Sequence, residues 1–245
     1  MSISGLKDII IMIIEQLTDL ANDALNYPKK YNGFLGVSIL HKFFSKKNMS
    51  FYFEWSSKQF KEFIVILMDD PDKYNFQIFK NMDEKTALIH ARKISDQLKL
   101  GYERTLKSLN ISNIKVVQFR DFITDEKYIR ILDEVNSYRK INNEFNNNLN
   151  LLMDIGIGGK IKELPYNVER IEEIRKILIN YIIEELASII YLSENDYPIE
   201  LDPTIEFITK KKIYEGDFEV LYTKLNLTKR GHIYIHPEGI VKNSY

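Results

Sequence analysis

The hydrophobic positions of this 245-residue chain alternate between short continuous runs and longer segments with helical spacing. A short apolar run bounded by turn residues is typical of a strand that is buried on both faces of a sheet. Three such runs predict strands at 33–38, 63–70 and 114–119, and weaker strands are expected at 204–209 and 232–236. The remaining periodic segments predict helices at 5–26, 47–59, 83–109, 126–152 and 167–191.

This alternation predicts an α/β fold of the Rossmann-like kind, with a mostly parallel sheet and helices on both faces. The chain shows no internal repeat and no linker, so residues 1–245 are expected to form a single domain. Ligands of such sheets bind at the carboxyl ends of the strands. Ser38, Asp69 and Phe119 are expected at those ends.

Composition narrows the function classes. The chain has no cysteine, which removes disulfides, thiol nucleophiles and thiolate metal sites and fits a reducing, cytoplasmic compartment. The net charge is −1, so a polyanion would have to meet a local basic patch. The run "IIIMII" (9–14) is too short to span a bilayer, and no signal peptide is evident. We expect no membrane association and a helix that packs on the domain.

Ser38 ends the first predicted strand in a G-x-S pattern. A serine there can cap the following turn, or it can be a nucleophile. The nucleophile elbow of α/β hydrolases needs a glycine two residues later, where this chain has Leu40. A serine hydrolase is therefore kept only as a second choice of enzyme class, and it would need a histidine base. The available histidines are His41, His90, His232 and His236.

A second constellation lies on the helix expected around 178–191. Tyr181, Glu185 and Ser188 are spaced i, i+4 and i+7, so they share one face. A carboxylate among the isoleucines of this helix is costly to bury without a partner. Glu185 could bind a cation such as an α-ammonium beside the Tyr181 hydroxyl. The alternative is a salt-bridged or partly exposed glutamate, and Glu184 is expected to be the exposed neighbour.

The helix expected at 83–109 carries basic residues within an arc of about 140°. This arc could contact the phosphate backbone of a nucleic acid. Asp96 and Glu103 interrupt it, so an ordinary solvated face is the alternative. The basic residues are Lys85, Arg92, Lys93, Lys99, Arg104 and Lys107.

Three further patterns do not support a cofactor. "GIGGK" (156–160) lacks the spacing of the nucleotide-binding fingerprints. "DDPD" (69–72) could bind a cation, but no other ligand set accompanies it. His232 and His236 are four residues apart in a strand, about 13 Å, and cannot share a metal ion. We predict no metal site and no cofactor.

Taken in order, these motifs resemble the cyclodipeptide synthase family, whose members are Rossmann-like and related to class I tyrosyl- and tryptophanyl-tRNA synthetases. "FLGVSILHKFFSKKNMSFYFEW" (34–55) resembles the family's first strand with its serine nucleophile. "YIIEEL" (181–186) resembles its tyrosine–glutamate helix, and "NDYPIE" (195–200) resembles its catalytic-loop tyrosine. His41 and Pro198 stand where one subfamily has asparagine and histidine, so the chain resembles the other, tyrosine–proline subfamily. His41 could replace the asparagine or only line the pocket.

The resemblance implies a ping-pong reaction on two aminoacyl-tRNAs. Ser38 would become an aminoacyl-enzyme, with the aminoacyl ammonium held by Tyr181 and Glu185. A dipeptidyl-enzyme would follow, and its cyclisation would release a diketopiperazine with Tyr197 as proton relay. The tRNA ester already carries the activation, so no ATP is needed. We expect a monomer. The alternative outside the enzymes is a non-catalytic tRNA-binding module.

The resemblance also implies a pocket for the first aminoacyl side chain. Two of its implied walls, Ser188 and Asn195, are polar, and unpaired buried polar groups would disfavour a hydrocarbon guest. This predicts a product with at least one polar residue. The alternative is that Ser188 and Asn195 bond to backbone and leave an apolar pocket. The implied pocket residues are Phe34, Gly36, Val65, Leu67, Phe119, Ser188, Asn195 and Pro198.

Overall fold

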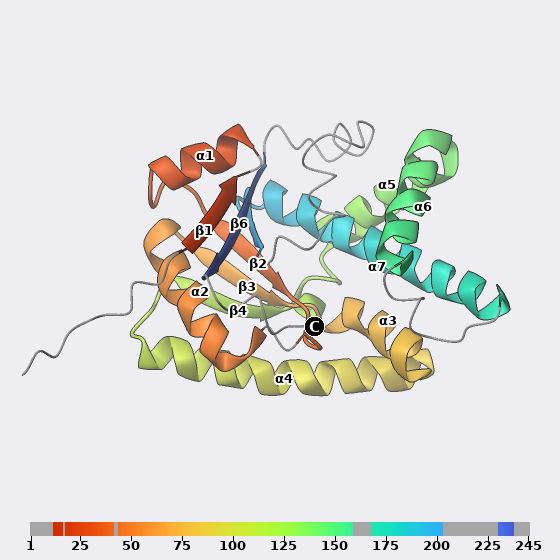
Figure 1. Cartoon of the computed structure of the whole chain (residues 1–245), viewed down its shortest axis with the longest axis horizontal. Coiled ribbons are helices and arrows are strands. Elements are labelled where there is room, and N and C mark those ends of the chain that lie inside the picture. Colours follow the sequence, from red (N-terminus) through yellow and green to blue (C-terminus); the bar gives the residue numbers. More distant parts are fainter. Residues whose placement is uncertain (1–11, 17, 42–43, 159–167, 203–229, 238–245) are drawn as a thin grey trace, which may run out of the picture.

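A twisted sheet lies at the centre of the computed structural model, which describes residues 12–16, 18–41, 44–158, 168–202 and 230–237 (Figure 1). Its strand order is β1-β6-β5-β2-β3-β4. All neighbouring pairs are parallel except β1 with β6. This confirms the mostly parallel sheet. The strands are β1 (Met12–Gln16), β2 (Gly33–Val37), β3 (Phe63–Leu67), β4 (Ile114–Gln118), β5 (Ile199–Asp202) and β6 (Gly231–Pro237).

Helices cover both faces of the sheet, as the alternating pattern predicts (Figure 1). One hydrophobic cluster joins the sheet to the first, second and fourth helices, and another joins it to the fifth, sixth and seventh. The third helix packs against both α4 and α7. The helices are α1 (Asp19–Asn26), α2 (Lys46–Gln59), α3 (Asp69–Lys80), α4 (Glu84–Ser108), α5 (Glu126–Ile141), α6 (Asn143–Gly158) and α7 (Val168–Glu194).

Strand side chains alternate between these two clusters. In β2, Leu35 and Val37 belong to the cluster on the α4 side, whereas Phe34 belongs to the cluster on the α7 side. The alternation places Gly36 and the following Ser38 on the α7 side as well. The nucleophile candidate therefore lies at the carboxyl end of β2, on the face that α7 covers.

The N-terminal prediction was wrong where the structure describes it. Residues 12–16 form β1, which pairs antiparallel with β6, and are not part of the predicted helix. The isoleucine-rich run has high strand propensity, and pairing with the neighbouring strand satisfies its main-chain groups. Residues 1–11 and the expected strand 204–209 lie outside the described residues. β5 was not predicted from the sequence, because its buried acids Glu200 and Asp202 interrupt the apolar pattern.

The second predicted strand was too long, and a helix behind it was missed. β3 ends at Leu67, and α3 begins at Asp69. Its first turn holds Asp69, Asp70 and Asp72, which complement the positive end of the helix dipole. Pro71 is tolerated there because the first-turn amides have no helical partner. The "DDPD" stretch is therefore a helix start.

The predicted helix 126–152 is two helices. α5 ends at Ile141, and α6 begins at Asn143. The Asn142 side chain accepts a hydrogen bond from the Phe145 amide at 2.9 Å, which caps the start of α6.

Candidate active site

Ser38 follows β2 directly and is bonded to α3. Its Oγ donates a hydrogen bond to Oδ1 of Asp72 at 3.2 Å, and the Ile39 amide donates to Oδ2 of Asp72 at 2.6 Å. Parallel strands end at the same edge of a sheet, so the turn after β2 meets the helix that starts after β3. This edge holds a serine hydroxyl against a carboxylate.

Asp72 is fully buried, with no exposed surface. Its Oδ1 also accepts from Nδ2 of Asn75 at 2.6 Å. Burial raises the pKa of Asp72 to about 7, although the hydrogen bonds from Ile39, Asn75 and Ser38 favour the charged form. The carboxylate of Glu185 raises that pKa further by repulsion. Asp72 can therefore both accept and donate a proton near neutral pH.

α7 brings the tyrosine–glutamate pair to the same edge. The charge of Glu185 acts on Asp72, and Tyr181 is one helical turn from Glu185. The Tyr181 ring stands edge-on to the ring of Tyr74 on α3, with 6.5 Å between centroids. The structure thus groups Ser38 with the helix of Tyr181 and Glu185, and it adds Asp72.

Glu184 is not the exposed neighbour that the sequence suggested. Its Oε1 accepts a hydrogen bond from the Tyr74 hydroxyl at 2.6 Å. The same oxygen forms an ion pair with Lys73 Nζ at 3.4 Å. The Glu184 side chain is 18% exposed, and burial raises its pKa. Glu184 holds α7 against α3, so it orients the helix that carries Glu185.

The implied pocket walls divide between the two faces of the sheet. Phe34 and Phe119 lie in the hydrophobic cluster on the α7 side, the face of Ser38. Val65 and Leu67 belong to the opposite cluster, so they cannot line a pocket beside Ser38. Their neighbours Ile64, Ile66 and Met68 take that face instead. Neighbouring residues of a strand point to opposite faces of the sheet, so moving the assignment by one residue replaces the side chains that can line the pocket.

Gly36 leaves room beside Ser38. A Cβ atom built at Gly36 would meet Met68 Sδ at 3.8 Å, an ordinary contact, and the glycine is partly exposed. This fits a substrate group that approaches the sheet beside the serine.

The two polar walls bond to backbone. Ser188 Oγ donates to the Glu185 carbonyl at 2.7 Å, and Asn195 Nδ2 donates to the Tyr191 carbonyl at 3.0 Å. The Asn195 carbonyl oxygen accepts from Lys127 Nζ at 3.1 Å. These bonds remove the reason to expect a polar guest, because the polar groups already have partners.

Tyr197 and Pro198 lie at the opposite, amino edge of the sheet. They precede β5, whose first residue, Ile199, pairs with Gly33 at the start of β2. Gly33 is five residues from Ser38, about 17 Å along the strand. The Tyr197 hydroxyl donates to Oε2 of Glu62, just before β3, at 3.2 Å. The structure does not bring Tyr197 to Ser38, which contradicts the predicted relay role.

His41 closes the turn after Ser38. Its amide donates to the Ser38 carbonyl at 3.3 Å, its side chain is exposed, and its ring lies 5.9 Å from that of Phe44. His232 is buried on β6, with Nδ1 3.7 Å from Glu200 and Nε2 4.0 Å from Asp202. Of His236 only the backbone is described. Within the described ranges, no three acidic or histidine side chains are grouped so as to hold a metal ion.

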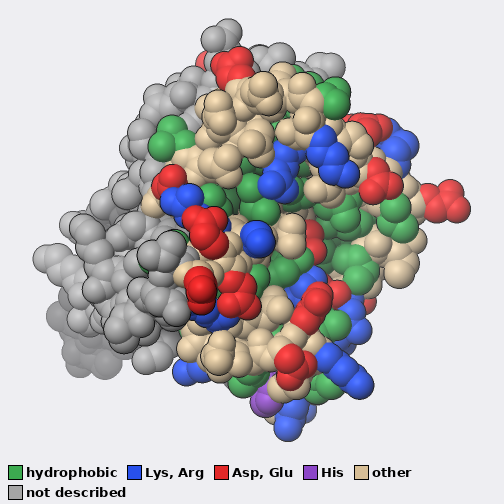
Figure 2. All heavy atoms as spheres, turned by 90° about the vertical axis from the view of Figure 1, so that its right-hand side faces the viewer, with side chains coloured by type: hydrophobic (Ala, Val, Ile, Leu, Met, Phe, Trp, Pro, Cys, Tyr) green, Lys and Arg blue, Asp and Glu red, His purple; other side chains and the backbone are tan. Residues whose placement is uncertain are grey.

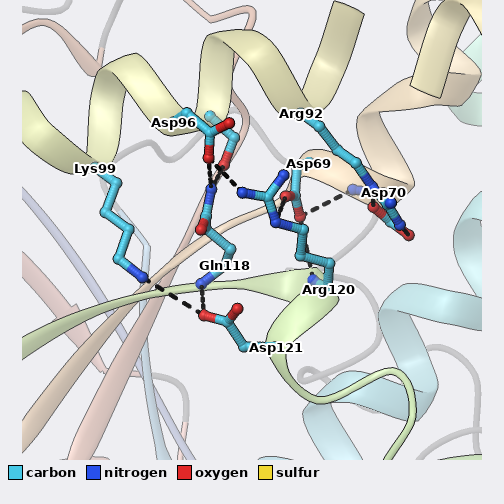
Figure 3. Close-up of polar contacts among 9 residues, drawn as sticks. Asp69, Asp70, Arg92, Asp96, Lys99, Gln118, Arg120 and Asp121 are labelled. Carbon is cyan, nitrogen blue, oxygen red and sulfur yellow. Dashed lines mark hydrogen bonds and ion pairs between the residues drawn. The ribbon is translucent and has the colours of Figure 1, made fainter. Parts of the chain in front are cut away.

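Two of the six basic residues predicted on α4 are engaged with acids at the carboxyl edge (Figure 3). Arg92 forms two hydrogen bonds with Asp70, at 2.9 and 2.8 Å. Lys99 lies 3.7 Å from Asp121, which follows β4. The other four, Lys85, Lys93, Arg104 and Lys107, are exposed.

The same network contains Arg120, which the sequence analysis missed. Arg120 pairs with Asp69 at 3.6 Å and also with Asp96 on α4. Figure 2 shows basic and acidic side chains mixed over the neighbouring face, with hydrophobic side chains between them. In the parts of the chain that the structure describes, no helix is both long and apolar enough to cross a membrane.

The sequence profile of the cyclodipeptide synthase family matches residues 24–191. This span includes Ser38, Asp72, Tyr181 and Glu185. The chain therefore belongs to the cyclodipeptide synthase family and is an aminoacyltransferase. A comparison with curated proteins gives no match.

Solved structures show the same fold. A cyclodipeptide synthase from Bacillus thermoamylovorans superposes with a TM-score of 0.73 at 17% identity, over 92% of this chain and 96% of that one. The cyclodipeptide synthase from Candidatus Glomeribacter gigasporarum, bound to Phe-tRNAPhe, gives 0.58 at 15% identity, over 91% and 93%. A tyrosyl-tRNA synthetase from Archaeoglobus fulgidus gives 0.52 at 12% identity, over 91% and 60%. The fold is that of the class I synthetases.

Proposed function

We propose that this protein joins the aminoacyl groups of two aminoacyl-tRNAs into a cyclic dipeptide through an acyl-enzyme at Ser38. The observation that carries the proposal is the hydrogen bond from Ser38 to the buried Asp72 at the carboxyl edge. A ligand of this sheet would bind at that edge.

The reaction needs no ATP, because the ester bond to each tRNA already activates the aminoacyl group. Ser38 Oγ attacks the carbonyl carbon of the first aminoacyl ester, the bond to the ribose oxygen breaks, and that oxygen takes up the proton. The amine of the aminoacyl-enzyme then attacks the second aminoacyl ester, which gives a dipeptidyl-enzyme and a second free tRNA. Finally the terminal amine attacks the ester on Ser38, which closes the ring and restores the serine hydroxyl.

Glu185 and Tyr181 would hold the aminoacyl ammonium. The charge of the partly exposed Glu185 acts on the buried carboxylate of Asp72 and raises its pKa. A bound cation would offset the repulsion between the two. Phe34, Gly36 and Phe119 would face the side chain of the first residue. A polar product and the tyrosine–proline subfamily lose their support, because Ser188 and Asn195 have partners and Tyr197 lies at the other edge.

The tRNA would approach over α4. A relative of this fold was solved with Phe-tRNAPhe bound, and α4 presents Lys85, Lys93, Arg104 and Lys107 to solvent. Arg92 and Lys99 have acidic partners, so they would contribute less. An exposed ion pair such as Lys99–Asp121 is weak and could open to a phosphate, whereas the two-bond contact of Arg92 is stronger.

The test is labelling of the protein with radioactive aminoacyl-tRNAs, together with mass spectrometry of extracts from expressing cells. The native protein should carry an acid-stable acyl group and yield a diketopiperazine. Ser38→Ala should do neither while it melts like the native protein. Ser137→Ala, an exposed serine of α5, is the matched control and should behave like the native protein. Equal labelling of native and Ser38→Ala protein would refute the assignment.

A further inference from the structure

Two buried aspartates stand in the first turn of α3, and their surroundings differ. Asp69 and Asp72 have no exposed surface. Asp69 Oδ1 accepts from the Arg120 amide at 3.3 Å, and its Oδ2 lies 3.6 Å from Arg120 Nε. Asp72 accepts instead from the hydroxyl of Ser38. Asp69 therefore joins the start of α3 to the residues after β4, whereas Asp72 is bonded to the proposed nucleophile.

We propose that Asp72 is a catalytic residue that removes the proton from Ser38 Oγ as this oxygen attacks the aminoacyl ester and then delivers it to the departing ribose oxygen. The proton balance closes within the site, because the exchange of one ester for another releases and consumes none. The inference rests on the proposed function and names the group that serves it as base.

The geometry suits this role. The 3.2 Å between Ser38 Oγ and Asp72 Oδ1 is within reach of a proton transfer, and such bonds tighten when substrate binds. The Ile39 amide and the Asn75 side chain hold the two oxygens of Asp72, each at 2.6 Å. The carboxylate is therefore fixed while the hydroxyl, with its single rotatable bond, can turn to the substrate.

The electrostatics suit a group that takes and returns a proton. The groups that face Asp72 are Ser38 and the Ile39 amide from the turn after β2, Asn75 of its own helix, and Glu185 of α7. With its pKa near 7, Asp72 is partly ionised at neutral pH, and a base works best under that condition. The substrate ammonium, held by Glu185, would favour the ionised form at the moment of attack.

The experiment measures single-turnover acylation of the full chain by radioactive aminoacyl-tRNA from pH 5 to 8.5. The native rate should rise with pH and level off above about 7. Asp72→Asn keeps the size of the side chain but cannot accept the proton. It should lower the rate at least about 100-fold and remove the rise. Asp69→Asn, the matched control, should keep the native pH profile.

The outcomes separate the two proposals. If the native protein forms no acyl-enzyme, the proposed function fails. If it does, and Asp72→Asn acylates at the native rate with the native pH profile, Asp72 is not the base. Should Asp72→Asn fail to fold, the native profile decides. A rate that does not change between pH 5 and 8.5 would overturn the role of Asp72.

Discussion

The two edges of the sheet each hold a hydroxyl hydrogen-bonded to a carboxylate, at the same distance. Ser38 donates to Asp72 at 3.2 Å at the carboxyl edge, and Tyr197 donates to Glu62 at 3.2 Å at the amino edge. Asp72 is fully buried and Glu62 is exposed. Hydrogen-bond geometry alone therefore does not distinguish a reactive pair from a surface contact.

Burial accounts for the difference. It raises the pKa of Asp72 to about 7, so that this carboxylate can exchange a proton near neutral pH. At the amino edge it is the tyrosine whose pKa is raised, first by partial burial and then by the bond to Glu62, which makes the phenol a poorer acid. An ion pair or hydrogen bond that is exposed to water contributes little to stability. This difference supports our proposal that the reaction takes place at the carboxyl edge.

After the changes at Ser38 and Asp72 described above, the largest effect should come from Glu185→Gln, which tests whether the carboxyl edge binds a cation. Loss of a charge-assisted hydrogen bond to the ammonium should lower product formation by about 10- to 100-fold. The same change should lower the pKa of Asp72, because a neighbouring negative charge is gone. The rise of the acylation rate with pH should therefore occur at lower pH.

Glu184→Gln is the control for this experiment. Glu184 holds α7 to α3, so its loss should mainly lower the melting temperature. If Glu185→Gln kept the native turnover and the native pH dependence of acylation, Glu185 would not bind the substrate ammonium.

An intermediate effect is expected on the outer face of α4. Replacing the exposed Lys85, Lys93, Arg104 and Lys107 by glutamine should raise KM for aminoacyl-tRNA roughly fivefold at moderate salt, because phosphate contacts are lost. It should also flatten the salt dependence of KM. The double change of Arg92 and Lys99 should matter less, since both residues pair with acids. KM measured across salt concentrations checks both variants, and equal losses from the two would contradict this ranking.

Sequence pattern predicted the parallel core well, because buried strands such as β2 and β3 are continuous apolar runs. It also offered Ser38, Tyr181 and Glu185 as candidates, and the structure brings Ser38 and the helix of the other two to one edge of the sheet. It missed α3, because "DDPD" interrupts the apolar pattern although three aspartates and a proline are a helix-start signal. Without α3 the partner of Ser38 could not be found.

The remaining errors concern faces and edges. The family resemblance implied Val65 and Leu67 as pocket walls, whereas Ile64 and Ile66 share the face of Ser38. The sequence pattern does not correct this, because a strand in a doubly covered sheet is apolar on both sides. The relay role of Tyr197 was implied by the resemblance of "NDYPIE" to the family's catalytic-loop tyrosine and not by any expected strand position. The start of β5 at Ile199 puts Tyr197 at the amino edge. Neither assignment can be made from composition, because both depend on where a strand begins and which way its residues point.

The smallest effect is expected from Tyr197→Phe, and it can break the comparison of the two edges. This change removes the hydroxyl that bonds to the exposed Glu62 and keeps the ring. The free energy of unfolding should fall by on the order of 0.5 kcal/mol, and diketopiperazine formation should change by less than about twofold. Tyr181→Phe, which removes a hydroxyl at the carboxyl edge, is the matched control and should cost more activity. Product yields and melting curves of both variants supply the measurement. If Tyr197→Phe lost product as completely as Ser38→Ala while folding normally, the amino edge would take part in catalysis and the division of labour between the edges would be wrong.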